Sequence, residues 1–196
     1  MIRFRNLVPR SRCLAAAALA LASSCLVQVH ARMAPLPSPT HQEQYALAGR
    51  VVHVADGDTF TLLVDGRRHR IRMASIDAPE TSKGSGRPGQ PMAQASRKAL
   101  ARLIAGKILR LECFEHDQYG RDVCDVPLGD GRSANREQVA TGMAWANMEG
   151  HGRFMRDPQI PALEQHARRE RLGLWGGSHP EQPWVWRYQC WKKGRC

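Results

Sequence analysis

The sequence lacks several patterns that would indicate a zinc centre or a membrane protein. It has no Cys-X-X-Cys motif, and its eight histidines do not show the spacing of metal ligands. A zinc site is therefore not expected. The longest apolar run, residues 13–29, is shorter than the stretch of about 20 residues that crosses a bilayer. No internal repeat is present.

The first 31 residues are predicted to be a secretory signal peptide. Residues 1–12 carry four arginines and no acidic residue, and the apolar run leads to Val29–Ala31, which suits a cleavage site. A membrane anchor is the alternative, and Cys25 leaves a lipoprotein site open. We expect an exported protein, periplasmic or secreted, with no stable membrane span after cleavage.

Acidic residues are few relative to basic ones. The chain has 29 Lys and Arg against 18 Asp and Glu, a net charge of +11. Without residues 1–31, 25 basic residues remain against the same 18 acids, so the net charge stays at +7. This favours a polyanionic partner such as nucleic acid, although charge alone is equally compatible with a basic protein that has no such partner.

Four cysteines follow the predicted cleavage site, and an even number in an exported chain favours disulfides. Three pairings are possible. We predict the two bonds between the cysteines nearest in sequence, Cys113–Cys124 and Cys190–Cys196.

The pattern of apolar residues predicts one α+β domain. Residues 32–45 are rich in proline and polar residues, which indicates a disordered lead-in. Beyond them we expect strands, including a hairpin that turns at Asp65–Gly66, and three helices. The strand runs are 49–54, 59–64, 67–73, 107–114 and 121–128, and the helices are 91–106, 133–146 and 160–175. Five strands with three helices favour a small closed β-barrel packed against helices.

Carboxylates stand at both ends of the basic hairpin. Asp58 begins one strand and Asp77 follows the next, and antiparallel pairing would place both at one end of the sheet. Two carboxylates there can bind a hard cation, while Arg72 and Glu80 add a guanidinium and a third carboxylate. This set suits phosphodiester hydrolysis. Turn aspartates beside a solvated basic strand would give the same spacing.

Three segments resemble a known family in order and spacing. They are DGDT at 56–59, IRMASIDAPE at 71–80 and DQYGR at 117–121, and they are similar to the active-site segments of the staphylococcal-nuclease-like, or thermonuclease, family. The three helix segments also resemble the family's, so the likeness covers about residues 46–177. It implies a five-stranded OB-type barrel with three helices. It also implies a calcium-dependent phosphodiesterase that cuts DNA and RNA and leaves 3′-phosphate ends.

The resemblance implies a calcium site. Asp58 and Asp77 would supply carboxylates to Ca²⁺. The backbone carbonyl of Ala78 would be a further ligand, at a position where the family often has threonine.

The resemblance also implies three catalytic residues. Glu80 would be the general base or would orient the attacking water. Arg72 would bind the phosphate and stabilise its developing charge, and Arg121 would contact the phosphate and the leaving oxygen. One departure from the family is that residues 147–154 contain no tyrosine, so the usual stacking against the nucleotide is not expected.

The leading hypothesis is thus a monomeric exported nuclease that prefers single-stranded nucleic acid. A binding module of the same fold without useful turnover is the alternative, and a structural envelope protein is a third. The enzyme is favoured because the chain has all five of the side chains implied for metal binding and catalysis, namely Asp58, Arg72, Asp77, Glu80 and Arg121. Residues 178–196, an aromatic and basic tail, have no counterpart in the resemblance. The tail either binds single strands or, as we favour, packs on the domain with Cys190–Cys196 holding it.

Overall fold

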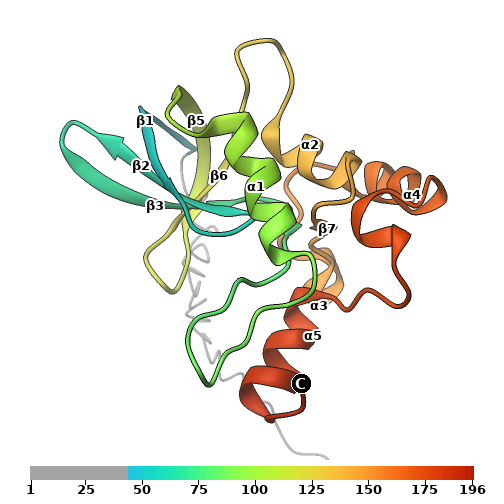
Figure 1. The fold of residues 1–196 in the computed structure, drawn as a ribbon. Coiled ribbons are helices and arrows are strands. Elements are labelled where there is room, and N and C mark those ends of the chain that lie inside the picture. The colour runs from blue at the N-terminus through green and yellow to red at the C-terminus, as the bar shows by residue number, and fades with distance from the viewer. Residues whose placement is uncertain (1–43) are drawn as a thin grey trace, which may run out of the picture. The chain divides into compact units, whose positions relative to one another are not determined.

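A computed structural model describes residues 44–196 (Figure 1). The predicted signal peptide and nearly all of the predicted lead-in lie outside the described residues. The strands are β1 (Tyr45–Val54), β2 (Thr59–Val64), β3 (Arg67–Met73), β4 (Ile76–Asp77), β5 (Ile108–His116), β6 (Asp122–Asp125) and β7 (Trp145–Ala146). The helices are α1 (Ala93–Ile104), α2 (Ala134–Ala140), α3 (Glu149–Gly152), α4 (Ile160–Arg169) and α5 (Pro183–Trp186), with a 3₁₀ turn η1 (Gly173–Gly176) and a π-helical segment η2 (Arg187–Lys192).

Five strands close into a barrel in the order β1-β2-β3-β6-β5. All neighbours are antiparallel except β3 and β6, which run parallel. The alternation in β3 explains its place, because Ile71 and Met73 are buried in the core while Arg68 and Arg70 are exposed. The α+β barrel predicted from the sequence is confirmed.

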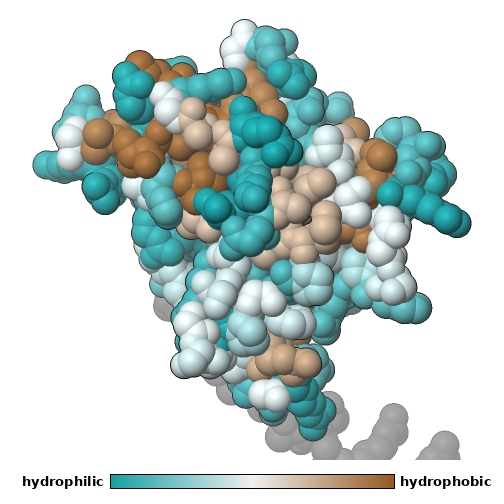
Figure 2. All heavy atoms as spheres, in the orientation of Figure 1, coloured by the Kyte–Doolittle hydropathy of each residue, from teal (hydrophilic) through white to brown (hydrophobic). Residues whose placement is uncertain are grey.

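The surface of the domain carries both polar and apolar areas. Polar residues cover much of the face shown, and apolar residues gather over the barrel (Figure 2). Among the described residues, no helix has both the length and the apolar character needed to cross a bilayer.

The helices are shorter than the sequence predicts. The helix expected over 133–146 ends at Ala140. After a turn at residues 141–144, Trp145 and Ala146 form β7, which pairs with β4. The helix expected over 160–175 ends at Arg169 and is followed by η1. Residues in the left-handed region follow both ends, Gly142 with a φ of 69° and Arg171 with a φ of 52°, and neither conformation continues a helix. A Cβ on Gly142 would lie 2.2 Å from the Leu172 carbonyl oxygen, and one on Gly173 would lie 2.3 Å from the Gly142 carbonyl oxygen.

The first helix also begins later than expected. It was predicted from residue 91 but starts at Ala93, because Met92 takes a left-handed φ of 67° and cannot be part of the helix.

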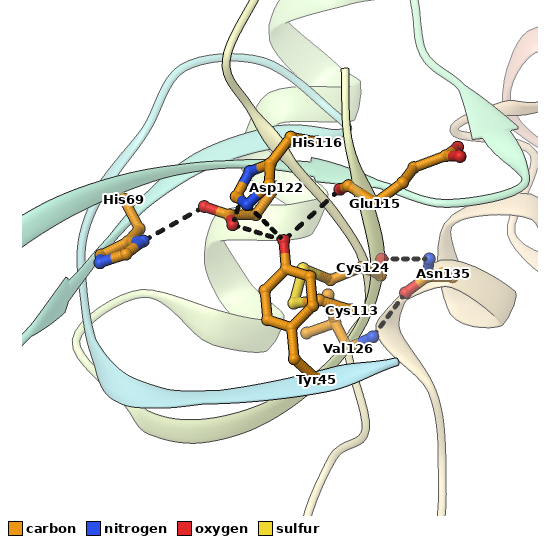
Figure 3. The surroundings of a disulfide bond; sticks show 9 residues. All are labelled: Tyr45, His69, Cys113, Glu115, His116, Asp122, Cys124, Val126 and Asn135. Carbon is orange, nitrogen blue, oxygen red and sulfur yellow. Dashed lines mark hydrogen bonds and ion pairs between the residues drawn. A yellow bond between two sulfur atoms is a disulfide. The ribbon is translucent and has the colours of Figure 1, made fainter. Parts of the chain in front are cut away.

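The two disulfides have the pairing predicted from the sequence. Cys113–Cys124 joins directly opposed residues of β5 and β6, and Cys190–Cys196 closes the end of η2. Figure 3 shows the first bond beside Tyr45, whose hydroxyl donates to Asp122 at 2.6 Å.

A buried amide joins this corner of the barrel to α2. The side chain of Asn135 accepts a hydrogen bond from the Val126 N–H at 3.0 Å and donates to the Cys124 carbonyl at 3.4 Å (Figure 3). It also donates to the Ala74 carbonyl at 2.9 Å. Strand β6 is thereby fixed to the helix and to the turn after β3.

Asp125, at the end of β6, gives a test of the fold's pH dependence. Burial, together with the charges of Asp157 and Glu112, raises the pKa of Asp125 from 3.8 to about 6. Because the folded state holds this proton more tightly, the ionised carboxylate lowers stability above pH 6. The cost fades as the pH falls through 6 and is gone below 3.8. Asp125→Asn is expected to stabilise the protein by about 1 kcal/mol at pH 7.5, allowing for solvent screening, and to have little effect near pH 4.

Urea unfolding of both proteins at the two pH values measures this difference. Asp65→Asn is the matched control, because Asp65 is exposed and its left-handed φ of 47° is one that asparagine tolerates. If Asp125→Asn raised the free energy of unfolding by the same amount at both pH values, the electrostatic explanation would be contradicted.

Candidate active site

The three segments singled out in the sequence converge on one groove. Asp58, Arg72, Glu80 and Arg121 all line a groove of about 1330 Å³. Asp77 lies beneath it, with only 1% of its surface exposed. The structure therefore brings the predicted site residues to one neighbourhood.

Asp77 reaches this place by a route that the sequence reasoning did not predict. It was expected to follow the strand that pairs with the Asp58 strand, at the same end of one sheet. Instead β3 ends at Met73, Ser75 turns the chain with a left-handed φ of 66°, and Asp77 lies in β4, opposite Trp145 of β7. The Ser75 hydroxyl oxygen holds this turn by accepting hydrogen bonds from the backbone N–H of residues 156 and 157, at 2.8 and 3.0 Å.

Arg72 forms the centre of the site. Its guanidinium pairs with Asp58 through Nη1 and with Asp77 Oδ1 through Nη2, the latter at 2.7 Å. Asp58 also accepts hydrogen bonds from the Ala78 N–H at 2.5 Å and the Thr59 hydroxyl at 2.9 Å. Register explains the pairing, because Thr59, the residue after Asp58, lies opposite Arg72 in the β2–β3 ladder.

The charges in this cluster compensate one another. Burial by itself would raise the pKa of Asp58, but the Arg72 guanidinium outweighs it and lowers the pKa to about 2. Burial and the neighbouring Asp58 raise the pKa of Asp56 to about 7, although Lys83 Nζ lies 3.1 Å from its carboxylate. Asp56 shapes the turn before Asp58, because its Oδ1 accepts the Asp58 N–H at 3.4 Å, and it also lines the groove.

Glu80 lies beside the cluster and is held from two sides. Its N–H donates to Gln90 Oε1 at 2.9 Å, and its carboxylate accepts from Arg187 Nη1 at 2.8 Å. Burial raises the pKa of Glu80, the negative charge of Asp58 adds to this, and Arg187 opposes it. A carboxylate in such surroundings is a reasonable proton acceptor.

Arg121 lies on the groove wall contributed by the β5–β6 turn. Its Nε donates to Asp117 Oδ2 at 2.7 Å, and its guanidinium lies 5.5 Å from the centre of the Tyr119 ring. Asp117 Oδ1 also accepts the N–H groups of both residues, each at 2.9 Å. Asp117 therefore shapes the turn and orients Arg121, whose guanidinium forms its ion pair with Asp117 and not with Asp58 or Asp77.

Sequence reasoning missed Arg187. Its Nη2 lies 2.9 Å from Asp77 Oδ2 and its Nη1 lies 3.2 Å from Asp77 Oδ1, so it contacts both oxygens of a predicted metal ligand. No motif marks Arg187, and the only available signal was the basic and aromatic composition of the tail. The tail packs on the domain, as the favoured interpretation had it.

The oxygen donors of this site suit a hard divalent cation. Within residues 44–196, no three His, Cys, Asp or Glu side chains are arranged as a ready metal site. Nevertheless, Asp58 and Asp77 are buried carboxylates brought together by one guanidinium, and the Ala78 backbone adjoins both. Carboxylate and carbonyl oxygens are the ligands that such cations prefer.

The comparison with protein families agrees with this geometry. The family described as "Staphylococcal nuclease homologue" matches residues 70–177, more than half of the chain. The chain belongs to the staphylococcal nuclease family. This confirms the family predicted from the sequence and supports a nuclease that hydrolyses phosphodiester bonds. Members of the family need a divalent metal ion.

Individual relatives carry matching names. An "Uncharacterized endonuclease" of Escherichia coli O157:H7 is 36% identical over 141 residues, which cover 72% of this chain and 85% of the relative. A "Micrococcal nuclease" of Shigella flexneri is 37% identical over 147 residues, covering 71% and 79%. An "Uncharacterized endonuclease" of Haemophilus influenzae is 36% identical over 141 residues, covering 71% and 72%.

Residues 147–154, which contain no tyrosine, form part of the groove lining. In this part of the staphylococcal nuclease domain, Glu149, Arg153 and Phe154 line the groove. The Arg153 guanidinium lies 4.5 Å from the centre of the Phe154 ring. Trp191 and Lys192 of the tail add further aromatic and basic side chains to the groove lining.

Gly57 gives a test of how the Asp58 loop is positioned. A Cβ on Gly57 would lie 1.8 Å from Ser96 Oγ in α1 and 2.8 Å from the Ala78 Cβ. Gly57→Ala is therefore expected to push the loop away from α1, to cost about 2 kcal/mol of stability, and to displace Asp58 from Arg72. Gly86→Ala is the control, because a Cβ there meets nothing within 4 Å.

Thermal or urea unfolding measures the first effect, and nuclease activity of the folded fraction measures the second. Wild-type stability in the Gly57→Ala protein would show that the loop does not depend on this close approach.

Proposed function

We propose that the protein is an exported, calcium-dependent nuclease that cuts DNA and RNA and leaves 3′-phosphate ends. The observation that carries the proposal is the buried cluster in which Arg72 joins Asp58 to Asp77, with Glu80 beside it in an open groove. Family membership and the names of the relatives support the same chemistry.

The groove suits a polyanion. Its cationic lining comes from several parts of the chain and faces the same space as the Arg72 cluster. These residues are Arg70, Arg72, Lys83, Arg87, Arg121, Arg153, Arg156, Arg187 and Lys192. Because phosphate contacts release counterions, affinity for nucleic acid is expected to fall steeply with salt. A single strand fits this arrangement, since Phe154 and Trp191 offer ring faces for its unpaired bases.

Asp58, Asp77 and the carbonyl of Ala78 would hold the divalent cation. When bound, it would polarise a phosphoryl oxygen and neutralise developing charge.

The chain's own residues account for the remaining chemistry. Glu80 accepts a proton from the attacking water, whose oxygen forms a bond to phosphorus. The bond to the 5′ oxygen breaks, and that oxygen takes a proton from solvent and leaves as a 5′-hydroxyl. Arg72 and Arg121 donate to phosphoryl oxygens, where negative charge accumulates in the transition state. The planar guanidinium suits this task better than lysine, because it donates two parallel hydrogen bonds.

Export and a monomeric state belong to the same proposal. The basic start followed by an apolar run supports export. Two disulfides in the folded domain agree with an oxidising compartment, periplasmic or extracellular.

The first prediction of this function concerns cleavage itself. The purified protein is expected to cut single-stranded DNA and RNA in the presence of calcium, and to stop when calcium is chelated. End analysis is expected to find 3′-phosphate on the fragments. Salt-sensitive binding without cleavage, in folded protein with calcium present, would instead identify a binding module of the same fold.

The second prediction concerns Glu80. Glu80→Gln keeps the size and polarity of the side chain but removes its basicity. Turnover is expected to fall about 100-fold or more, with nucleic-acid affinity nearly unchanged. Glu170→Gln, at an exposed position after α4, is the control. Equal turnover in Glu80→Gln and wild type would remove Glu80 from its role as base.

A further inference from the structure

The C-terminal segment contributes a charged side chain to the active site. Arg187, the first residue of η2, contacts both oxygens of Asp77 and one oxygen of Glu80, at 2.8 to 3.2 Å. Two-thirds of its side chain is removed from solvent. A guanidinium placed on two acids of the site is a part of that site.

The segment is fixed in this place by several specific contacts. The indole N–H groups of Trp186 and Trp191 both donate to the Pro88 carbonyl, at 3.2 and 2.9 Å. The Cys190–Cys196 disulfide closes η2 behind them. Figure 1 shows α5 close to the long loop before α1, which contains Pro88.

One side chain connects the tail directly to the catalytic loop. Gln90 donates to the Glu181 carbonyl at 3.0 Å through its Nε2, while its Oε1 accepts the Glu80 N–H. The side-chain amide of Gln90 therefore bonds both the tail and the backbone of Glu80, and a movement of the tail affects Glu80.

Arg187 occupies the Asp77 oxygens that a metal ion would use. Asp77 Oδ1 accepts from Arg72 and Arg187, and Oδ2 accepts from Arg187. Because both oxygens already face guanidinium groups, a divalent cation that takes Asp77 as a ligand meets Arg187 at the same atoms. A positive charge at contact distance also opposes a dication directly.

We propose that Arg187 is a positioning residue of the active site, which holds Glu80 in place and competes with the divalent cation for Asp77. This inference rests on the proposed function of the same site. When the cation displaces Arg187 from Asp77, Arg187 can still pair with two other carboxylates. Its ion pair with Glu80 remains, and Glu149 Oε2 lies 3.8 Å from its Nη2.

Competition of this kind is reciprocal. Whatever weakens the hold of Arg187 on Asp77 raises affinity for the cation, and bound cation loosens Arg187 from Asp77 by the same factor. A merely structural role for Arg187 predicts the reverse, because a disordered site would bind the cation less tightly.

Calorimetric titration of the purified full-length protein with calcium alone tests the competition. Arg187→Gln is expected to bind calcium about tenfold more tightly than wild type, and Arg187→Lys, which keeps the charge, is expected to stay closer to wild type. Arg132→Gln is the matched control, because Arg132 pairs with Asp130 and Glu137 away from the groove. Equal or weaker calcium binding by folded Arg187→Gln would overturn the inference.

Turnover at saturating calcium tests the positioning of Glu80. The kcat of Arg187→Gln is expected to fall about tenfold while its calcium affinity rises. Tighter calcium binding with unchanged kcat would overturn the positioning role. If Arg187→Gln does not fold, the Cys190→Ala/Cys196→Ala protein is the second variant, because it loosens the tail while keeping Arg187. It too is expected to bind calcium more tightly than wild type. Unchanged calcium affinity in this variant would count against the inference.

The two failures are distinguishable. Calcium-dependent cleavage by wild type, with no gain in calcium affinity in the variants, would leave the nuclease function standing and overturn the role of Arg187. A gain in affinity with no cleavage by the wild type would support the competition and reject the nuclease function.

Discussion

The pairing of Arg72 with Asp58 and Asp77 is the interaction on which the site depends. It joins the start of β2, the end of β3 and the separate strand β4 through one guanidinium. Each of the three charges is largely buried, and a buried charge without its partner is strongly unfavourable. Removing Arg72 would take the ion-pair partner from Asp58 and leave Asp77 with Arg187 alone, so the geometry of the site and the packing of these three elements are not independent.

This dependence explains why the surrounding scaffold is so closely held. Gly57 approaches Ser96 of α1, and the side-chain amide of Gln138 in α2 donates to the Gly57 carbonyl at 2.7 Å. The Asp58 loop is thus fixed by two helices, and β4 is fixed by β7 and by the Ser75 turn. Groups that must stabilise charge in a transition state act best when they are already in place before the reaction.

The barrel and half of the site could be predicted from local sequence. Alternation of apolar and basic residues in β3, and the turn at Asp65–Gly66, define the hairpin that brings Arg72 beside Asp58. The position of Asp77 could not be derived in this way, because it depends on a turn at Ser75 whose hydroxyl is held by residues far along the chain. The end of α2 is followed by Gly142 in a left-handed conformation, packed against Leu172 and Gly173, and the periodicity of apolar residues does not reveal this contact. Arg187 was beyond sequence reasoning because only the folded tail brings it to Asp77.

The way the barrel closes has a consequence for how the chain folds. β1 pairs with β2, its neighbour in sequence, and with β5, where Tyr45 lies opposite Cys113. The second pairing joins distant parts of the chain, and such non-local pairing is the slow kind to form. The Cys113–Cys124 bond lies at that same position and ties β5 to β6 across a short loop. Once the two cysteines are oxidised, β5 and β6 are already in register when β1 pairs with β5 and closes the barrel. The rate at which the barrel forms is therefore expected to depend on the redox state of the compartment in which the chain folds.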